Sequence, residues 1–180
     1  MTGRFIAVVG PSGVGKDSVM QGVAACDPRI VLARRVITRP SDAGGEDFVG
    51  VTQPDFQARM AAGDFALSWE AHGLHYAIPA TVEAQLQDGR DVLANLSRAA
   101  LIGAKVRFAR FEVINLTAAR EVLAARLVAR GRETATQIAG RLDRASAALP
   151  DGINALHLDN SGPLDQTVQA ALDRLYPVKV

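Results

Sequence analysis

The sequence predicts an α/β protein with a parallel sheet and helices on both faces. Short apolar runs alternate with helical patterns from one end of the 180-residue chain to the other. The first run, Phe5–Val9, is continuously apolar, as expected for a strand buried on both faces of its sheet. A chain of 180 residues is long enough for one domain with its own hydrophobic core. We therefore expect a single domain over residues 1–180.

The individual elements can be assigned in order along the chain. Apolar and β-branched runs predict strands over residues 5–9, 30–37, 65–69, 74–77, 91–96, 108–116 and 155–158. Apolar residues at helical spacing predict helices over residues 16–25, 53–62, 79–87, 117–130, 135–149 and 164–175. The segment 38–50 is polar and rich in Gly and Asp. Any second lobe is therefore expected as an insertion, at about residues 38–77.

Composition excludes several classes of function. The chain has 20 Lys and Arg residues against 19 Asp and Glu, which argues against a protein that coats nucleic acid. Cys26 is the single cysteine, so an internal disulfide is excluded and a reducing compartment is favoured. No apolar stretch approaches the roughly 20 residues of a membrane span. We expect a soluble cytoplasmic protein that binds neither nucleic acid nor membrane, and the sequence does not predict its oligomeric state.

The strongest motif directly follows the first predicted strand and leads into a helix. Its glycines allow backbone N–H groups to surround phosphates, and the helix presents its positive N-terminus. Lys16 supplies a charge for the β- and γ-phosphates of a nucleotide. The strand–loop–helix context disfavours the alternative of an ordinary glycine-rich turn. These features predict an ATP-binding phosphate loop made of Gly10, Pro11, Ser12, Gly13, Val14, Gly15, Lys16, Asp17 and Ser18.

The residue after the lysine departs from the usual phosphate loop. That position normally carries a Ser or Thr that ligates Mg²⁺, whereas this chain has Asp17 there and a hydroxyl one residue later, at Ser18. The candidate strand 91–96 offers Asn95 in place of the usual acidic metal ligand. We interpret Asp17 as a carboxylate ligand for Mg²⁺ that has moved into the loop. The alternative, that Asp17 only stabilises the first turn of a helix, remains open.

Several stretches, in the same order along nearly the whole chain, resemble the guanylate kinase family. They are the phosphate loop, Thr38-Arg39-Pro40 with Gly45-Glu46, the segment 73–77, and the segment 126–133 with Arg141-Leu142. The resemblance implies a P-loop kinase fold with an acceptor-binding insertion at about residues 38–77 and a short lid at about residues 130–141. It also implies that Arg39 and Tyr76 hold the phosphate of the acceptor, and that Arg130 and Arg141 close over the transferring phosphoryl group.

The departures from guanylate kinases concern the base-binding part of the site. Leu67 stands where the resemblance leads us to expect a guanine-binding Glu, and Asn95 and Ser97 stand where acidic residues are expected. A site without these carboxylates loses the hydrogen bonds that read guanine. Arg35 replaces a small hydroxyl residue four positions before Arg39, and even spacing on an extended strand would put both on one face. These departures predict a small, strongly anionic acceptor without a base.

Five short segments extend the resemblance to the ribose 1,5-bisphosphate phosphokinases, small bacterial enzymes of phosphonate utilisation. The segments are Gly-Lys-Asp-Ser, Arg-Val-Ile-Thr-Arg-Pro, Ala-Gly-Gly-Glu-Asp, Asn-Leu-Ser-Arg and Arg130-Gly131-Arg132-Glu133. This resemblance implies transfer of the γ-phosphoryl group of ATP to the 1-phosphate of ribose 1,5-bisphosphate. The products would be 5-phosphoribosyl 1-diphosphate (PRPP) and ADP, with ATP and Mg²⁺ as cofactors.

An acceptor phosphate is already anionic, so the reaction needs positioning and charge stabilisation, without a general base. The predicted catalytic residues are Lys16, Arg39, Arg130 and Arg141. The predicted acceptor-binding residues are Arg35, Arg39, Glu46, Tyr76, Asn95 and Arg98. Among them, Glu46 is assigned with Asp47 to the ribose hydroxyls, and Asn95 and Arg98 are assigned to the floor of the pocket.

Three other functions remain open at this point. One is a guanylate-kinase-like nucleoside monophosphate kinase, and another is a non-catalytic binding module that keeps the kinase fold. The third is a kinase for a neutral sugar or alcohol, with Glu46, Asp47 or Glu70 as the general base that such an acceptor requires.

Overall fold

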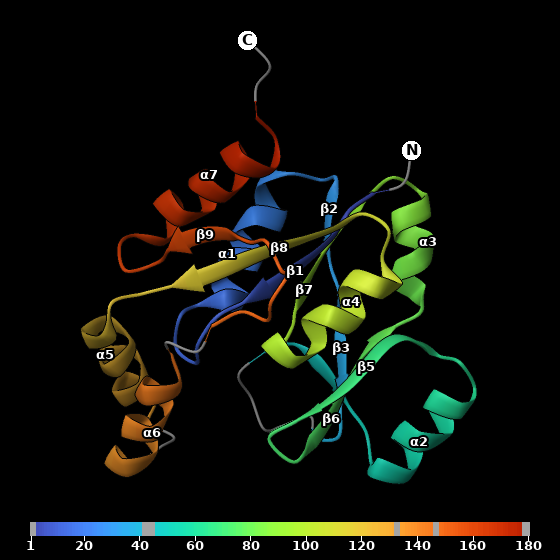
Figure 1. Cartoon of the computed structure of the whole chain (residues 1–180), viewed down its shortest axis with the longest axis horizontal. Helices are drawn as coiled ribbons and strands as arrows, with labels where there is room; N and C mark the ends of the chain where they lie inside the picture. Colours follow the sequence, from blue (N-terminus) through green and yellow to red (C-terminus); the bar gives the residue numbers. More distant parts are fainter. Residues whose placement is uncertain (1–2, 41–45, 132–133, 146–147, 178–180) are drawn as a thin grey trace.

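The computed structural model describes residues 3–40, 46–131, 134–145 and 148–177 (Figure 1). Its centre is a parallel five-stranded sheet in the order β2-β7-β1-β8-β9. All five residues of the central strand β1 are buried, as their apolar character predicts. The strands are β1 Phe5–Val9, β2 Ile30–Leu32, β7 Asp91–Asn95, β8 Phe111–Thr117 and β9 Leu156–Asp159.

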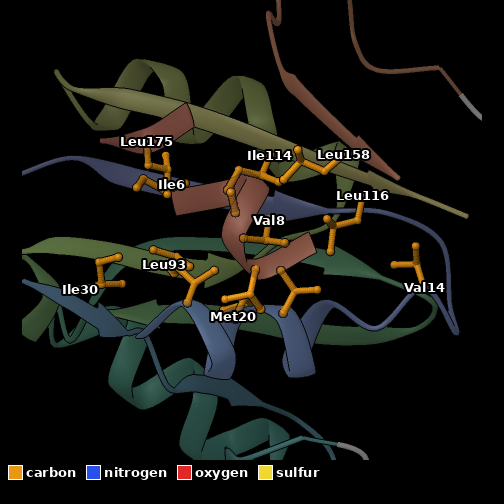
Figure 2. Close-up of a cluster of buried hydrophobic side chains, with 14 of the residues drawn as sticks. Ile6, Val8, Val14, Met20, Ile30, Leu93, Ile114, Leu116, Leu158 and Leu175 are labelled. Carbon is orange, nitrogen blue, oxygen red and sulfur yellow. The ribbon is translucent and has the colours of Figure 1, made fainter. Parts of the chain in front are cut away.

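Successive side chains of β1 enter two different cores. Ile6 and Val8 pack with residues of α1 (Lys16–Cys26) and α7 (Leu164–Leu175) in the cluster that Figure 2 shows. Phe5 and its alternate neighbours pack on the opposite face, against α3 (Thr81–Gln87) and α4 (Leu101–Arg107). This alternation follows from the two-residue period of a strand. The predicted fold, a parallel sheet with helices on both faces, is confirmed.

A second sheet lies beside the first, in the order β4-β3-β6-β5. Its strands are β3 Arg35–Ile37, β4 Phe48–Gly50, β5 Phe65–Ala71 and β6 Leu74–Pro79. Helix α2 (Gln53–Ala61) covers one face, where Phe56 packs with Val36 and Ala77. The other face carries the alternate residues, because Ile37 is paired with Tyr76 and Tyr76 with Trp69.

Two parts of the predicted element order are wrong. The predicted strand 30–37 is two strands, since the chain leaves the central sheet after Leu32 and enters the second sheet at Arg35. The sequence also failed to predict β4 and the helical segment η2–α4, in which η2 spans Arg98–Ala100. Strand β4 forms by pairing with β3. Helix α4 exposes Ile102 and Val106, so its sequence has no distinct polar face.

Helices α5 (Arg120–Arg130) and α6 (Ala135–Ala145) pack against each other (Figure 1). Helix α5 begins three residues after the predicted start at residue 117, because Thr117 is the last residue of β8. Of the predicted helix 135–149, residues 135–145 are helical and residues 148–149 are not, while residues 146–147 lie outside the described chain. In the described ranges, no helix is long and apolar enough to cross a membrane.

Candidate active site

The phosphate loop joins β1 to α1, as predicted, and two of its glycines cannot be replaced without strain. Gly10 has a φ of 152°, and a Cβ there would lie 2.6 Å from the carbonyl oxygen of Leu116 on β8. Gly15 has a φ of 93°, and a Cβ there would lie 2.7 Å from the side-chain nitrogen of Asn160. Only glycine suits positions that combine positive φ with such close contacts.

Asn160 and Arg126, which sequence reasoning did not assign to the phosphate loop, both donate hydrogen bonds to its backbone. The carbonyl oxygen of Val14 accepts hydrogen bonds from Asn160 Nδ2 at 2.7 Å and from Arg126 Nη1 at 3.3 Å. Asn160 directly follows β9 and is buried. The sequence signal for it was weak, because an Asn after a strand is equally typical of an ordinary turn. Asn160 and Arg126 are positioning residues that stabilise the shape of the loop.

Lys16 begins α1 and turns back over the loop. Its Nζ donates to the carbonyl oxygens of Gly10 at 2.9 Å and Pro11 at 3.3 Å. Burial lowers the pKa of Lys16 to about 8, although the negative charge of Asp17 opposes this shift, and the charges of Arg35 and Arg130 lower it further. The negative charge of Glu46 also opposes the shift, so charges from the loop, the region of the second sheet and α5 all act on the pKa of Lys16.

Asp17 lies beside the end of β7. Asn95 Nδ2 donates to Asp17 Oδ1 at 3.1 Å, so the amide expected in the acceptor pocket instead orients the carboxylate in the loop. Within the described ranges, no group of three or more His, Cys, Asp or Glu residues could hold a metal ion. A magnesium ion beside Asp17 would therefore depend on the nucleotide phosphates for further ligands, which is a common arrangement for this ion.

The face of the second sheet opposite α2 carries Ile37, Tyr76 and Trp69, and it is the predicted acceptor face. A compact ion-pair network lies at this face. Glu46 accepts hydrogen bonds from Arg35 Nη2 at 2.5 Å and Nε at 3.0 Å, and Arg39 Nη2 lies 3.7 Å from the same carboxylate. The Arg35 guanidinium lies 5.3 Å from the ring centroid of Tyr76, and that of Arg39 lies 4.2 Å from the ring centroid of Phe48. Aromatic faces attract such cations and help to orient them.

This network corrects the reason given for one prediction. Arg35 and Arg39 do not share an extended strand, because β3 ends at Ile37, so their even spacing was the wrong reason to place them together. Glu46 brings them together. Its carboxylate pairs with the two arginines, and its assignment to ribose hydroxyls stays a prediction. The negative charge of Glu46 also offsets the cation that Arg35 was predicted to add to the pocket.

The predicted lid arginines lie near the phosphate loop. Arg141 Nη1, on α6, donates to Ser12 Oγ at 2.8 Å. Arg130 is the last residue of α5, and its charge acts on Lys16. Arg98 Nη2 donates to the carbonyl oxygen of Ala145 at 3.3 Å, at the end of α6. Gly45, Arg132 and Glu133, which contributed to the guanylate kinase resemblance, lie outside the described residues.

The geometry thus joins a phosphate loop, a candidate metal ligand and several arginines, and similar proteins identify the family. Over 170 residues the chain is 54% identical to "Ribose 1,5-bisphosphate phosphokinase PhnN" of Ruegeria sp. (strain TM1040), covering 94% of this chain and 90% of that protein. The chain belongs to the ribose 1,5-bisphosphate phosphokinase family. A member from Azotobacter vinelandii is 47% identical over 177 residues, covering 96% of this chain and 95% of its own. No protein-family model matches the chain.

A solved structure supports the fold of this ribose 1,5-bisphosphate phosphokinase family member. Guanylate kinase from Anaplasma phagocytophilum superposes with a TM-score of 0.73, covering 99% of this chain and 88% of that one. Because the two sequences are 16% identical, the likeness concerns the fold alone. The P-loop kinase fold that the sequence predicted is therefore confirmed.

Proposed function

We propose that the protein transfers the γ-phosphoryl group of ATP to the 1-phosphate of ribose 1,5-bisphosphate, producing PRPP and ADP. Membership of the family supports this activity. The proposal depends on the charges around Lys16. Arg130, Arg35 and Glu46 all act on Lys16, and Glu46 pairs with both Arg35 and Arg39 on the acceptor face of the second sheet. Such a face suits phosphates better than it suits a base, because its carboxylate is already engaged by arginines.

The phosphate loop would bind the β- and γ-phosphates of ATP. Lys16 Nζ, which donates to the carbonyl oxygens of Gly10 and Pro11, would turn to the phosphates. A desolvated ammonium group gains a large stabilisation from an anion in a site of low dielectric. Bound phosphate would therefore raise the pKa of Lys16 from about 8 and keep the group charged during the reaction.

Asp17, with the Ser18 hydroxyl nearby in sequence, would hold Mg²⁺ between the loop and the nucleotide. The ion, when bound, neutralises charge on the β- and γ-phosphates. Asn95 would orient the carboxylate through its 3.1 Å hydrogen bond, so that a ligand oxygen is held in one direction. The alternative role of Asp17, stabilising the first turn of α1, requires no such partner.

The chemical step would proceed by in-line displacement. An oxygen of the acceptor 1-phosphate attacks the γ-phosphorus, the bond from that phosphorus to the β–γ bridging oxygen breaks, and ADP leaves. We assign Arg39 and Tyr76 to the attacking phosphate, with Glu46 and Arg35 holding Arg39 in place. Arg130 and Arg141 would approach the transferring group from the lid and stabilise its charge. No proton has to be removed from the acceptor.

We infer that these parts work within one cytoplasmic domain. The second sheet, residues 35–79, would act as the acceptor-binding insertion and the α5–α6 pair as the lid. Arg141 already contacts Ser12 of the loop at 2.8 Å, so the lid would need only a local adjustment to engage a bound nucleotide. The partners would be ATP and a small sugar bisphosphate, and the product PRPP would place the protein in phosphonate metabolism.

One panel of acceptors tests this function. ADP release is measured with ribose 1,5-bisphosphate, GMP, ribose 5-phosphate and gluconate at the same ATP and Mg²⁺ concentrations. We expect the highest kcat/KM with ribose 1,5-bisphosphate. A higher value with GMP would favour a nucleoside monophosphate kinase, a higher value with gluconate would favour a neutral-sugar kinase, and no ADP release with any acceptor would favour a binding module.

A further inference from the structure

Three buried polar groups at the junction of β5 and η2 have no hydrogen-bond partner among the described residues. Trp69 Nε1, Ser97 Oγ and Arg98 Nε are buried, and the described part of the chain offers none of them a hydrogen bond. More than nine in ten buried polar groups in proteins are paired, because an unpaired one loses its hydration without compensation. Three such groups near one place therefore point to a ligand.

Arg98 is a half-buried cation whose Nε is buried. Its Nη2 donates to the uncharged carbonyl oxygen of Ala145 at 3.3 Å, and burial lowers its pKa. Among the described residues, no carboxylate forms an ion pair with it. Arg35, which is buried, is bound by Glu46. A partly desolvated charge is costly unless it is paired, so Arg98 is suited to an anion that arrives with a ligand.

The strand register places these groups at one end of the acceptor face. Trp69 on β5 is paired with Tyr76 on β6, and their rings stack with centroids 5.5 Å apart. Arg35 lies on β3, the next strand, above the Tyr76 ring. Two strand spacings make about 10 Å, and the Tyr76 ring lies between Trp69 and Arg35. Arg35 and Arg39 therefore mark one end of the face and Trp69 the other.

Ser97 and Arg98 reach the same end from the central sheet. They follow Asn95, which ends β7 and contacts Asp17. Strand β5 packs against η2, the short helix that Arg98 begins. Leu67 and Trp69, the side chains of β5 on this side, pack against the core cluster that contains Leu96 and Ala100. The indole, the hydroxyl and the guanidinium are thus brought to one junction between the two sheets.

We propose that Arg98, Ser97 and the Trp69 indole N–H bind the phosphate of the acceptor that is not phosphorylated, the 5-phosphate of ribose 1,5-bisphosphate. The inference rests on the proposed function. Glu46 offsets the charge of Arg35, so the Arg35–Arg39–Glu46 network retains one net positive charge for the reacting phosphate. A second phosphate needs a second cation, and Arg98 supplies it. Three donors on one phosphate also satisfy all three orphaned groups.

The test compares two acceptors that differ only in the 5-phosphate. Arg98→Met is assayed with ribose 1,5-bisphosphate and with ribose 1-phosphate. Loss of a charge-assisted contact should lower kcat/KM for the bisphosphate about 10- to 100-fold. The value for ribose 1-phosphate should stay close to that of the unmodified protein. If ribose 1-phosphate is not turned over, its inhibition constant against the bisphosphate takes the place of kcat/KM.

Matched variants separate binding from folding. Arg107→Met removes a neighbouring arginine on α4 that is paired with Glu83, and it should change neither acceptor's kcat/KM. Trp69→Phe keeps a ring against Tyr76 but removes the indole N–H, and it should lower kcat/KM for the bisphosphate alone, by less than Arg98→Met. Without ligand, Arg98→Met should melt at the same or a higher temperature, because an uncompensated charge has been removed. The bisphosphate should raise its melting temperature less than it raises that of the unmodified protein.

The outcomes distinguish this subsite from the proposed function. An equal loss with both acceptors, or no loss with either, would overturn the assignment of Arg98 while the bisphosphate kinase activity stood. A lower melting temperature for ligand-free Arg98→Met, with the bisphosphate shift unchanged, would make Arg98 a structural residue. Failure of the unmodified protein to use ribose 1,5-bisphosphate would instead remove the proposed function itself.

Discussion

The two edges of the central sheet treat their buried cations differently. At the edge where the strands begin, Arg4 lies 2.6 Å from Asp91 and 3.2 Å from Glu112. Tyr176 completes this cluster by donating to Asp91 at 2.6 Å. At the edge where the strands end, Lys16 Nζ donates to two backbone carbonyls and Arg98 Nη2 to one. Arg4 is thus bound directly by carboxylates, whereas Lys16 and Arg98 donate to neutral oxygens, although Asp17 and Glu46 act on Lys16 from nearby.

The pKa shifts follow this difference. Burial would lower the pKa of Arg4, but its hydrogen bond to Asp91 and the charge of Glu112 raise it above its ordinary value. Burial lowers the pKa of both Lys16 and Arg98. A cation with a built-in carboxylate contributes to the fold whether or not a ligand is present. A cation that faces carbonyls keeps its desolvation cost until an anion binds, so it is suited to function.

The largest effect that this comparison predicts is on turnover. Lys16→Met should lower kcat about 10²- to 10³-fold, the loss expected when a preorganised charge on a transferring group is removed. The melting temperature should not fall, because the ammonium is held in a desolvated place. Steady-state kinetics and circular dichroism provide the measurements. Lys105→Met, which removes an exposed lysine on α4, is the matched control and should leave both unchanged. A normal kcat for Lys16→Met would contradict the conclusion that a cation facing carbonyl oxygens serves function.

The opposite result is expected at the other edge. Asp91→Asn should lower the free energy of unfolding by about 3 kcal/mol, because Arg4 would lose its buried counter-charge. The specificity constants should remain unchanged, since Asp91 lies at the far end of the strands. Urea denaturation checks the first statement and the acceptor assay the second. Glu112→Gln is the control: its side chain is 44% exposed, so its loss should cost less than about 1 kcal/mol.

The metal-binding role of Asp17 predicts a smaller effect on ion affinity. Asp17→Asn should raise the Mg²⁺ concentration for half-maximal rate by at least about tenfold, and Asp17→Ser should be partly tolerated. Asn95→Ala should shift the same concentration in the same direction, by about tenfold at most, because it removes the amide that orients the carboxylate. Rates are measured over a Mg²⁺ titration at saturating ATP. An unchanged Mg²⁺ requirement in both Asp17 variants would favour the helix-terminus role.

The smallest expected effect is a pH dependence of stability at the Arg4–Asp91 edge. Burial would raise the pKa of Asp91, but hydrogen bonds from Arg4 and Tyr176 lower it below its ordinary value of 3.8. As the pH falls below about 4, the unfolded chain binds a proton before the folded chain does, so the free energy of unfolding decreases. The contribution is complete above that range. Urea denaturation between pH 3 and 6 should show the stability difference between Asp91→Asn and the unmodified protein shrinking toward acid pH.

Sequence reasoning succeeded where the information is local. The phosphate loop was predictable because its glycines, its lysine and the preceding apolar strand are consecutive residues whose backbone geometry is set by their neighbours. The α/β class followed from periodicity, which is also local. It was less successful where two structures compete for the same residues. The run 30–37 is apolar enough for one strand, and only its pairing with β7 and then β6 divides it between two sheets.

The sequence by itself determined the phosphate loop, the parallel sheet and a set of arginines suited to phosphates. Only the tertiary structure decided which charged and polar groups pair with one another. Glu46 was expected on the sugar but binds Arg35 and Arg39, and Asn95 was expected in the acceptor pocket but binds Asp17. The physical reason is that an ion pair or an orphaned donor depends on distance in space. Trp69 and Arg98 lie 29 positions apart in the chain, and only the packing of β5 against η2 brings their segments together.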